Sequence, residues 1–188
     1  MRKILRGDCP QALNEKGAEW TERYGASGYW PTYKKRNLRD ILLDEGLRDQ
    51  TLKHCSYCDT IPFYPPGEET IDHFRPKATY PHLAYAWENL FYCCPFCQRK
   101  KYEEALIKPD DADYEFARYF QWEFATGRLL PNEVATSEDQ YRAERTIELL
   151  RLNLKHAESR VFLRESLETR PLSLDRHPYR DFIEMYFG

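Results

Sequence analysis

Apolar side chains recur with helical spacing in the last third of the chain. The residues that repeat at intervals of three and four are Ala143, Ile147, Leu150, Leu154, Ala157 and Val161. This spacing places them along one face, so it predicts one or two helices that pack along an apolar seam. Ser137 and Gln140 have the spacing of a capping box, and they predict where the first helix begins.

The N-terminal pattern predicts two further helices. Residues 11–24 read as a short polar helix, which the two glycines and the proline of residues 25–31 end. Residues 32–53 are then expected to be helical, because leucine and isoleucine recur there at a partial three-and-four spacing.

The middle of the chain predicts short strands. Residues 54–71 are irregular and rich in proline and glycine, but residues 70–74 are β-prone. The apolar run 83–93 ends in a predicted strand, and a helix with the sequence CPFCQRKKYEEAL is expected to open at Pro95, because proline is tolerated in a first turn. Residues 119–131 alternate about a Thr-Gly pair and predict a β-hairpin.

Length and composition predict a single folded unit. The 188 residues suit one domain, and an aromatic content of 15% excludes wholesale disorder. No apolar run approaches the ~18 residues of a membrane span. The opening MRKILRGDCPQ lacks the apolar stretch of a secretory signal, so we expect a cytoplasmic location.

Charge is unevenly distributed along the chain. The net charge of −3 argues against a protein whose whole surface binds nucleic acid. Basic residues nevertheless outnumber acidic ones in residues 72–101, and acidic residues outnumber basic ones in residues 102–188. A polyanion site is therefore expected in the first hundred residues, and the acidic part suits packing or a protein partner.

Four of the six cysteines form two C-x-x-C pairs, Cys55 with Cys58 and Cys94 with Cys97. Four thiolates give closed tetrahedral coordination, so the pairs predict a structural zinc ion. The two pairs are farther apart in sequence than in a compact zinc ribbon, which indicates an insert between the two knuckles, the turns that each carry one C-x-x-C pair. The sequence assigns no role to Cys9 or Cys93.

A redox reading of the second pair is the alternative. An apolar strand, CPFC and a helix would resemble a glutaredoxin-type motif. That reading leaves the first pair idle, and the remainder of a thioredoxin-like layout is missing. A tightly bound zinc ion that needs all four cysteines would exclude a thiol oxidoreductase.

The insert carries residues suited to phosphodiester hydrolysis. If the strand bends, Asp72 can bind a metal ion while His73 faces a water molecule, which divides the work between a cation and a general base. Asn89 could orient the imidazole, and Gln98 could supply a second oxygen ligand of the kind that Mg²⁺ accepts. The predicted phosphate contacts are Arg75, Lys77, Arg99, Lys100 and Lys101.

The order of these motifs resembles the HNH nuclease family. Many of its members carry a pattern like C-x-x-C, then D-H, N-L and C-x-x-C-N-x-x-K, and the resemblance covers roughly residues 54–102. It implies an α+β fold with a small ββα-metal core, in which Asp72 binds a divalent Mg²⁺ or Mn²⁺ ion and His73 is the general base. By the same resemblance Asn89 orients the base and Gln98 completes the metal site. Glutamine departs from the usual histidine or asparagine there.

Longer phrases extend the likeness. The opening MRKI, HCSYCD, DHFRPKATYPHLAYAWENLFYCCPFC and TIELLRLN resemble the PtuB family, the HNH component of Septu-type and retron-associated antiphage systems. This implies an effector nuclease controlled by an ABC/SMC-like ATPase, PtuA. The expected layout is a helical segment over 1–53, the nuclease core over 54–107, and a hairpin with C-terminal helices over 108–188, in one compact unit.

A zinc-braced module that binds a partner or nucleic acid without catalysis is the second hypothesis, and Gln98 is its best support. The aromatic residues of the central segment could stack on unpaired bases, but they are expected mainly to build the core around the small motif. These residues are Tyr80, Tyr85, Trp87, Phe91 and Tyr92. His54 finds no vacancy among four thiolates, and the remaining histidines, His82, His156 and His177, are expected to be structural or exposed.

Overall fold

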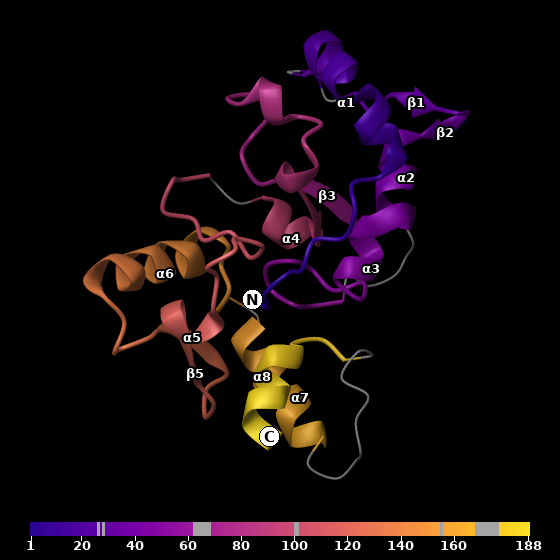
Figure 1. Ribbon diagram of the computed structural model, residues 1–188. Helices are drawn as coiled ribbons and strands as arrows, with labels where there is room; N and C mark the ends of the chain where they lie inside the picture. The colour runs from indigo at the N-terminus through magenta and orange to yellow at the C-terminus, as the bar shows by residue number, and fades with distance from the viewer. Residues whose placement is uncertain (26, 28, 62–68, 100–101, 155, 168–176) are drawn as a thin grey trace.

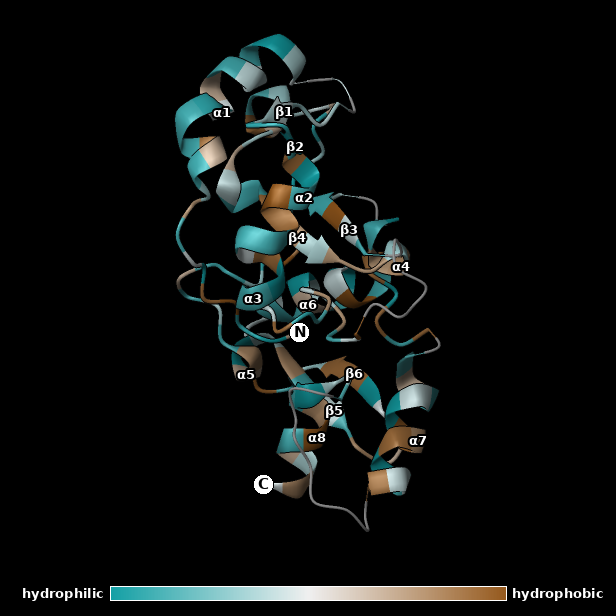
Figure 2. Cartoon of the chain, turned by 90° about the vertical axis from the view of Figure 1, so that its right-hand side faces the viewer, coloured by the Kyte–Doolittle hydropathy of each residue, from teal (hydrophilic) through white to brown (hydrophobic). Residues whose placement is uncertain are grey.

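The structure is a computed structural model that describes residues 1–25, 27, 29–61, 69–99, 102–154, 156–167 and 177–188. It is a mixed α and β fold, as the sequence predicted. Within these ranges, three two-stranded antiparallel sheets lie among helices. Both overall views show an elongated molecule, with α1 (Gln11–Tyr24) near one end and α7 (His156–Leu167) and α8 (Arg180–Phe187) near the other (Figures 1 and 2). None of the helices described is both long and apolar enough to cross a membrane.

The N-terminal segment departs from the predicted helix over residues 32–53. Residues 32–37 instead form a small hairpin of β1 (Thr32–Tyr33) and β2 (Arg36–Asn37). The turn is closed by Lys34 and Lys35, whose φ angles of 46° and 71° are left-handed and incompatible with a right-handed helix.

Within residues 32–53, helical structure begins only after this hairpin. The side chain of Asn37 accepts a hydrogen bond from the backbone N–H of Arg39 and caps α2 (Leu38–Leu42). A π-helical turn, η1 (Leu43–Leu47), and α3 (Arg48–Gln50) continue it. The leucines and Ile41 of α2 and η1 are buried against Leu90 and Tyr92 of the central sheet, and Figure 2 shows hydrophobic residues where α2 meets β3.

The central sheet pairs β3 (Thr70–His73) with β4 (Leu90–Cys93). Asp72 lies opposite Phe91, and His73 lies opposite Leu90. Two 3-10 turns, η2 (Pro81–Leu83) and η3 (Trp87–Asn89), lie in the connection, and α4 (Pro95–Gln98) follows β4 directly. Both strands and the helix start at Pro95 are as predicted.

The helix at Pro95 is much shorter than expected. It ends at Gln98, and the residues described after it, 102–106, are not helical. Arg99 leaves the helical region with φ −81° and ψ 9°. The ring of Tyr102 then packs edge-on against Phe74 and Tyr80, which directs the chain back toward the loop after β3.

The last part of the chain contains the predicted hairpin, formed by β5 (Phe120–Glu123) and β6 (Arg128–Pro131) after α5 (Phe116–Tyr119). The next helix, α6 (Ser137–Leu149), is capped one residue earlier than expected. The side chain of Thr136 accepts from the backbone N–H of Asp139. The predicted capping box at Ser137 is therefore wrong, because the amide of Gln140 donates instead to loop carbonyls, including that of Asn132.

The predicted apolar seam is broken between α6 and α7. Ala143 and Leu150 are buried, but Leu154 is 54% exposed. Arg151 has a left-handed φ of 54°, which ends the helix and resets the register of the residues after it. Leu154 therefore lies outside the seam that its spacing predicted.

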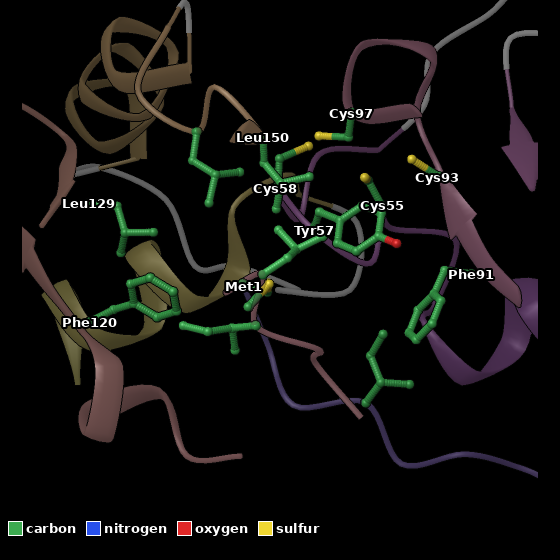
Figure 3. Packing of buried hydrophobic residues seen from close by; sticks show 14 of the residues in the cluster. Met1, Cys55, Tyr57, Cys58, Phe91, Cys93, Cys97, Phe120, Leu129 and Leu150 are labelled. Carbon is green, nitrogen blue, oxygen red and sulfur yellow. The ribbon is translucent and has the colours of Figure 1, made fainter. Parts of the chain in front are cut away.

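The largest buried cluster joins residues that are distant in sequence. Met1 and Ile4 pack with cysteines and aromatic residues of the central segment and with Phe120, Leu129 and Leu150 of the C-terminal part. Figure 3 shows Met1 between Tyr57 and Phe120. The cysteines are thus embedded in a core to which both ends of the chain contribute.

Candidate functional site

The two C-x-x-C pairs meet in one buried cluster. The Sγ atoms of Cys55, Cys58, Cys94 and Cys97 all lie within 4.8 Å of one another, and the cysteines form no disulfide. Thiolates at ~2.3 Å from a tetrahedral zinc ion lie about 3.8 Å apart, and the Sγ atoms of Cys58 and Cys94 are separated by 3.8 Å. Sulfur atoms of this cluster turn toward one another in Figure 3. The four cysteines could hold a metal ion and are compatible with structural zinc.

Backbone hydrogen bonds place both pairs. The N–H of Ser56 donates to the carbonyl of Tyr92 in β4, which ties the first knuckle to the sheet. Cys94 is the N-cap of α4, and its Sγ accepts from the N–H of Cys97 at 3.4 Å. Hydrogen bonds from neighbouring thiols lower the pKa of Cys94, whereas burial raises the pKa of Cys58. A metal ion would relieve this crowding, since thiolates release their protons to bind it.

The other two cysteines differ in environment. Cys93 is fully buried beside the cluster, its thiol donates to the carbonyl of Cys94, and burial raises its pKa. Cys9 is half-buried in the N-terminal segment and contacts the carbonyl of Pro10. Neither belongs to the four-cysteine cluster.

A second site lies where β3 faces α4. A hollow of about 310 Å³ opens there and brings together four of the predicted residues, Asp72, His73, Lys77 and Gln98. Trp30 and Tyr102 also line it. Asp72 and His73 are consecutive, yet both reach the hollow at the end of β3.

The carboxylate of Asp72 is held by a hydrogen bond from a buried tyrosine. Asp72 is 6% exposed, and its Oδ2 accepts a hydrogen bond of 2.6 Å from the hydroxyl of Tyr57. Burial and the nearby charge of Asp72 raise the pKa of Tyr57 well above its ordinary value, so this hydroxyl stays protonated and donates. The position of Tyr57 inside the first knuckle links the cysteine cluster to the hollow.

The ring of His73 is oriented by its Nε2 atom. Nε2 lies 2.9 Å from the carbonyl oxygen of Ala84. A carbonyl only accepts, so Nε2 carries a proton and donates to it. The indole of Trp30 stacks on the imidazole, with 5.8 Å between ring centroids and 24° between planes. These two contacts fix the position of the imidazole, a side chain suited to proton transfer near neutral pH.

Gln98 lines the hollow, whereas Asn89 is not among the residues that line it. Gln98 is exposed at the end of α4, and its Nε2 donates to the carbonyl of Ile71 in β3 at 3.3 Å. Asn89 is buried, its Oδ1 accepts from the N–H of Arg75, and its amide donates to the carbonyls of Arg75 and Leu83. Asn89 thus holds the backbone on both sides of the loop that follows His73.

The predicted cations that the structure describes differ in their surroundings. Lys77 is half-buried in the hollow, and burial lowers its pKa. Arg75 is exposed, lies 3.7 Å from Glu104 and stacks over Tyr80, whereas Arg99 is exposed directly after α4. Lys100 and Lys101 lie outside the described residues.

The expectations for the other aromatic residues and histidines are largely confirmed. Tyr85, Trp87, Phe91 and Tyr92 are at most 8% exposed and belong to the core, and Tyr80 is only partly buried. His82 is exposed, His54 is buried outside the cysteine cluster, and His177 is partly buried. Burial, with the nearby Arg160, lowers the pKa of His156 to about 4, so it is neutral at physiological pH.

Trp30 and Tyr57 are two site residues that the sequence pattern did not reveal. Trp30 follows a glycine-rich break, far from the D-H motif, and only the fold brings it onto His73. Tyr57 lies within CSYC, where only its neighbouring cysteines carried a signal.

Comparison with known proteins finds a curated protein to which the chain is similar. No family model matches the chain. Septu protein PtuB of Bacillus thuringiensis is 27% identical over 114 residues, which is 58% of this chain and 42% of that protein. The chain is therefore related to PtuB, as its sequence phrases indicated, although it matches less than half of that protein's length.

Proposed function

We propose that this chain is a metal-dependent HNH endonuclease that hydrolyses phosphodiester bonds of DNA or RNA. The observation that carries the proposal is the hollow between β3 and α4. It gathers Asp72, His73 and Gln98, an acid, a base and an amide, on a strand pair followed by a helix. The segments 1–53 and 108–188 then enclose a nuclease core over residues 54–107.

His73 would act as the general base. Its Nε2 proton is engaged by Ala84, so Nδ1 can take a proton from the attacking water. Asn89 supports this step by holding the loop that follows His73 through Arg75. The water would then attack the phosphorus atom from the side opposite to the leaving 3′ oxygen.

The donor set fits a hard divalent ion. Asp72 supplies a carboxylate, and the carbonyl of Gln98 supplies a neutral oxygen, the ligand types that Mg²⁺ or Mn²⁺ accepts. When bound, the ion would stabilise charge on the phosphate and on the leaving oxygen. Tyr57 keeps Asp72 in place by donating to its Oδ2.

The remaining predicted residues would hold the substrate and brace the site. Lys77 lies in the hollow and Arg75 and Arg99 are exposed near it, so they can contact successive phosphates, with Lys100 and Lys101 extending the same basic stretch. A zinc ion on Cys55, Cys58, Cys94 and Cys97 would fix the first knuckle against α4. That would fix the positions of Tyr57 and Gln98 relative to each other.

The relationship to PtuB supports a role in Septu-type antiphage defence. By the resemblance of the sequence to that family, the nuclease would act in the cytoplasm under the control of an ABC/SMC-like ATPase. The acidic excess of residues 102–188 suits such a protein partner.

One observation favours the second hypothesis of a non-catalytic binding module. The side-chain amide of Gln98 already donates to β3 through Nε2, so it serves a structural contact as well. If this is its sole task, the chain would bind a partner or nucleic acid without cutting.

The test is a cleavage assay with Mg²⁺ or Mn²⁺ on plasmid DNA, single-stranded DNA and total RNA. Wild-type protein and His73→Ala are compared, each alone and with the ATPase partner and ATP. Cutting by wild type but not by His73→Ala would support the nuclease and identify its substrate class. Binding of partner or nucleic acid without cutting under every condition would support the binding module instead.

A further inference from the structure

Trp30 reaches the hollow from outside the segment that carries the D-H and cysteine motifs. It lies between the break after α1 and the β1–β2 hairpin, and its ring stacks on His73. Its edge also meets the ring of Tyr85 at 88°, with 6.5 Å between centroids. An N-terminal aromatic residue is therefore wedged between a core tyrosine and the histidine of the hollow.

The backbone around Trp30 is fixed on both sides. The hydroxyl of Tyr85 donates to the carbonyl of Tyr29 at 2.7 Å. After Trp30, the amide of Asn37 donates to the Trp30 carbonyl, and the N–H of Leu38 donates to that of Pro31. The indole is thus presented by a tied-down segment, and its place does not depend on contact with His73 alone.

A stacking contact on the face of the His73 ring restrains the orientation of the ring plane, which a hydrogen bond in that plane does not. The terminal torsion of histidine has a broad energy profile, so its ring plane is weakly specified by rotamer preference. The bond from Nε2 to Ala84 fixes one atom of the ring, whereas the near-parallel indole opposes rotation of the whole plane. Small misplacement of a catalytic group is costly, since rates depend steeply on alignment.

We propose that Trp30 is a positioning residue for His73, which holds the imidazole plane in the orientation that general-base chemistry at Nδ1 requires. This inference rests on the proposed nuclease function. It assigns the N-terminal segment a part in the reaction beyond packing.

The experiment compares Trp30→Leu, which removes the planar ring, with Trp30→Phe, which keeps an aromatic face. Tyr29→Leu is the matched control, because it removes a neighbouring ring that packs on Tyr24. We expect Trp30→Leu to lower kcat by about ten- to a hundredfold with KM little changed. Trp30→Phe should recover most of the rate, and Tyr29→Leu should behave like wild type, all at equal zinc content.

A second measurement does not depend on cutting. The ring protons of His73, assigned with a His73→Gln variant, should show an upfield ring-current shift in the NMR spectrum of wild type and Trp30→Phe. Trp30→Leu should lose this shift. Failure of the proposed function would appear as a wild type that never cuts, and the NMR comparison would then still decide whether Trp30 orients the ring.

Three results would overturn the proposal. The first is a kcat for Trp30→Leu equal to that of Tyr29→Leu. The second is a higher KM at unchanged kcat, which would make Trp30 a substrate contact. The third is a His73 spectrum that does not respond to Trp30→Leu.

Discussion

Tyr57 and Asp72 show how single residues couple the cysteine cluster to the hollow. Tyr57 is fully buried between two ligand candidates of the first C-x-x-C pair, and its hydroxyl donates to Asp72. The motif pattern predicted the cysteines by their spacing and the D-H pair by its place in the order of the motifs. It could not predict Tyr57 or Trp30, whose roles arise only when distant segments meet.

Loss of one cluster cysteine should unfold the core. In Cys97→Ser we expect tight zinc binding to fail and the free energy of unfolding to fall by more than about 4 kcal/mol, since loss of a metal is among the largest single-site effects. Urea unfolding and zinc content measure both. Cys9→Ser is the control, because Cys9 lies outside the cluster. Equal zinc content and stability in the two variants would refute the metal site.

For single helices and strands, local sequence signals predicted whether an element occurs better than they predicted where it ends. The hairpin of β5 and β6, the strand pair β3–β4 and α1 lie where the sequence placed them. The errors arise where left-handed residues or tertiary contacts override periodicity. Lys34 and Lys35 turn the chain where a helix was expected, Arg151 breaks the seam, and Tyr102 packs where a longer α4 would have continued.

The turn of the β5–β6 hairpin should not tolerate a side chain at Gly127. Its φ of +68° favours glycine, and a Cβ there would clash with the carbonyl oxygen of Ala157 in α7. Gly127→Ala is therefore expected to destabilise the protein by about 1–3 kcal/mol or more in thermal or urea unfolding.

Gly7 offers the matched control for that substitution. A Cβ added at Gly7 meets no atom within 4 Å. Gly7→Ala should leave the stability within about 0.5 kcal/mol of wild type. A Gly127→Ala protein as stable as Gly7→Ala would show that the hairpin does not pack on α7 in this way.

Across the whole molecule, residues near the two ends of the chain contact the central segment. Arg6 donates to Asp110 and to the carbonyl of Leu90 in β4, and it stacks over Phe91. Near the C-terminus, Arg180 of α8 pairs with Asp59 beside the first cysteine knuckle. These long-range contacts have no sequence signature, because they join residues whose local patterns are ordinary.

The Arg180–Asp59 pair should be a strong tie between α8 and the knuckle. Both side chains are less than 10% exposed, and Arg180 also donates to the carbonyl of Thr51. Arg180→Leu leaves a buried carboxylate without its cation, which typically costs about 3–5 kcal/mol. Urea unfolding should show this loss, and Arg128→Leu at an exposed position should not. Similar stability of the two variants would contradict it.

The nuclease role of the hollow is best tested by the cleavage rate of His73→Ala beside that of His82→Ala, on the substrate that wild type cuts. His82 is an exposed histidine outside the hollow, so the two variants lose the same side chain from different places. With equal zinc content, we expect no detectable cutting by His73→Ala and a wild-type rate for His82→Ala. Full activity of His73→Ala would contradict the assignment of the hollow as the nuclease site.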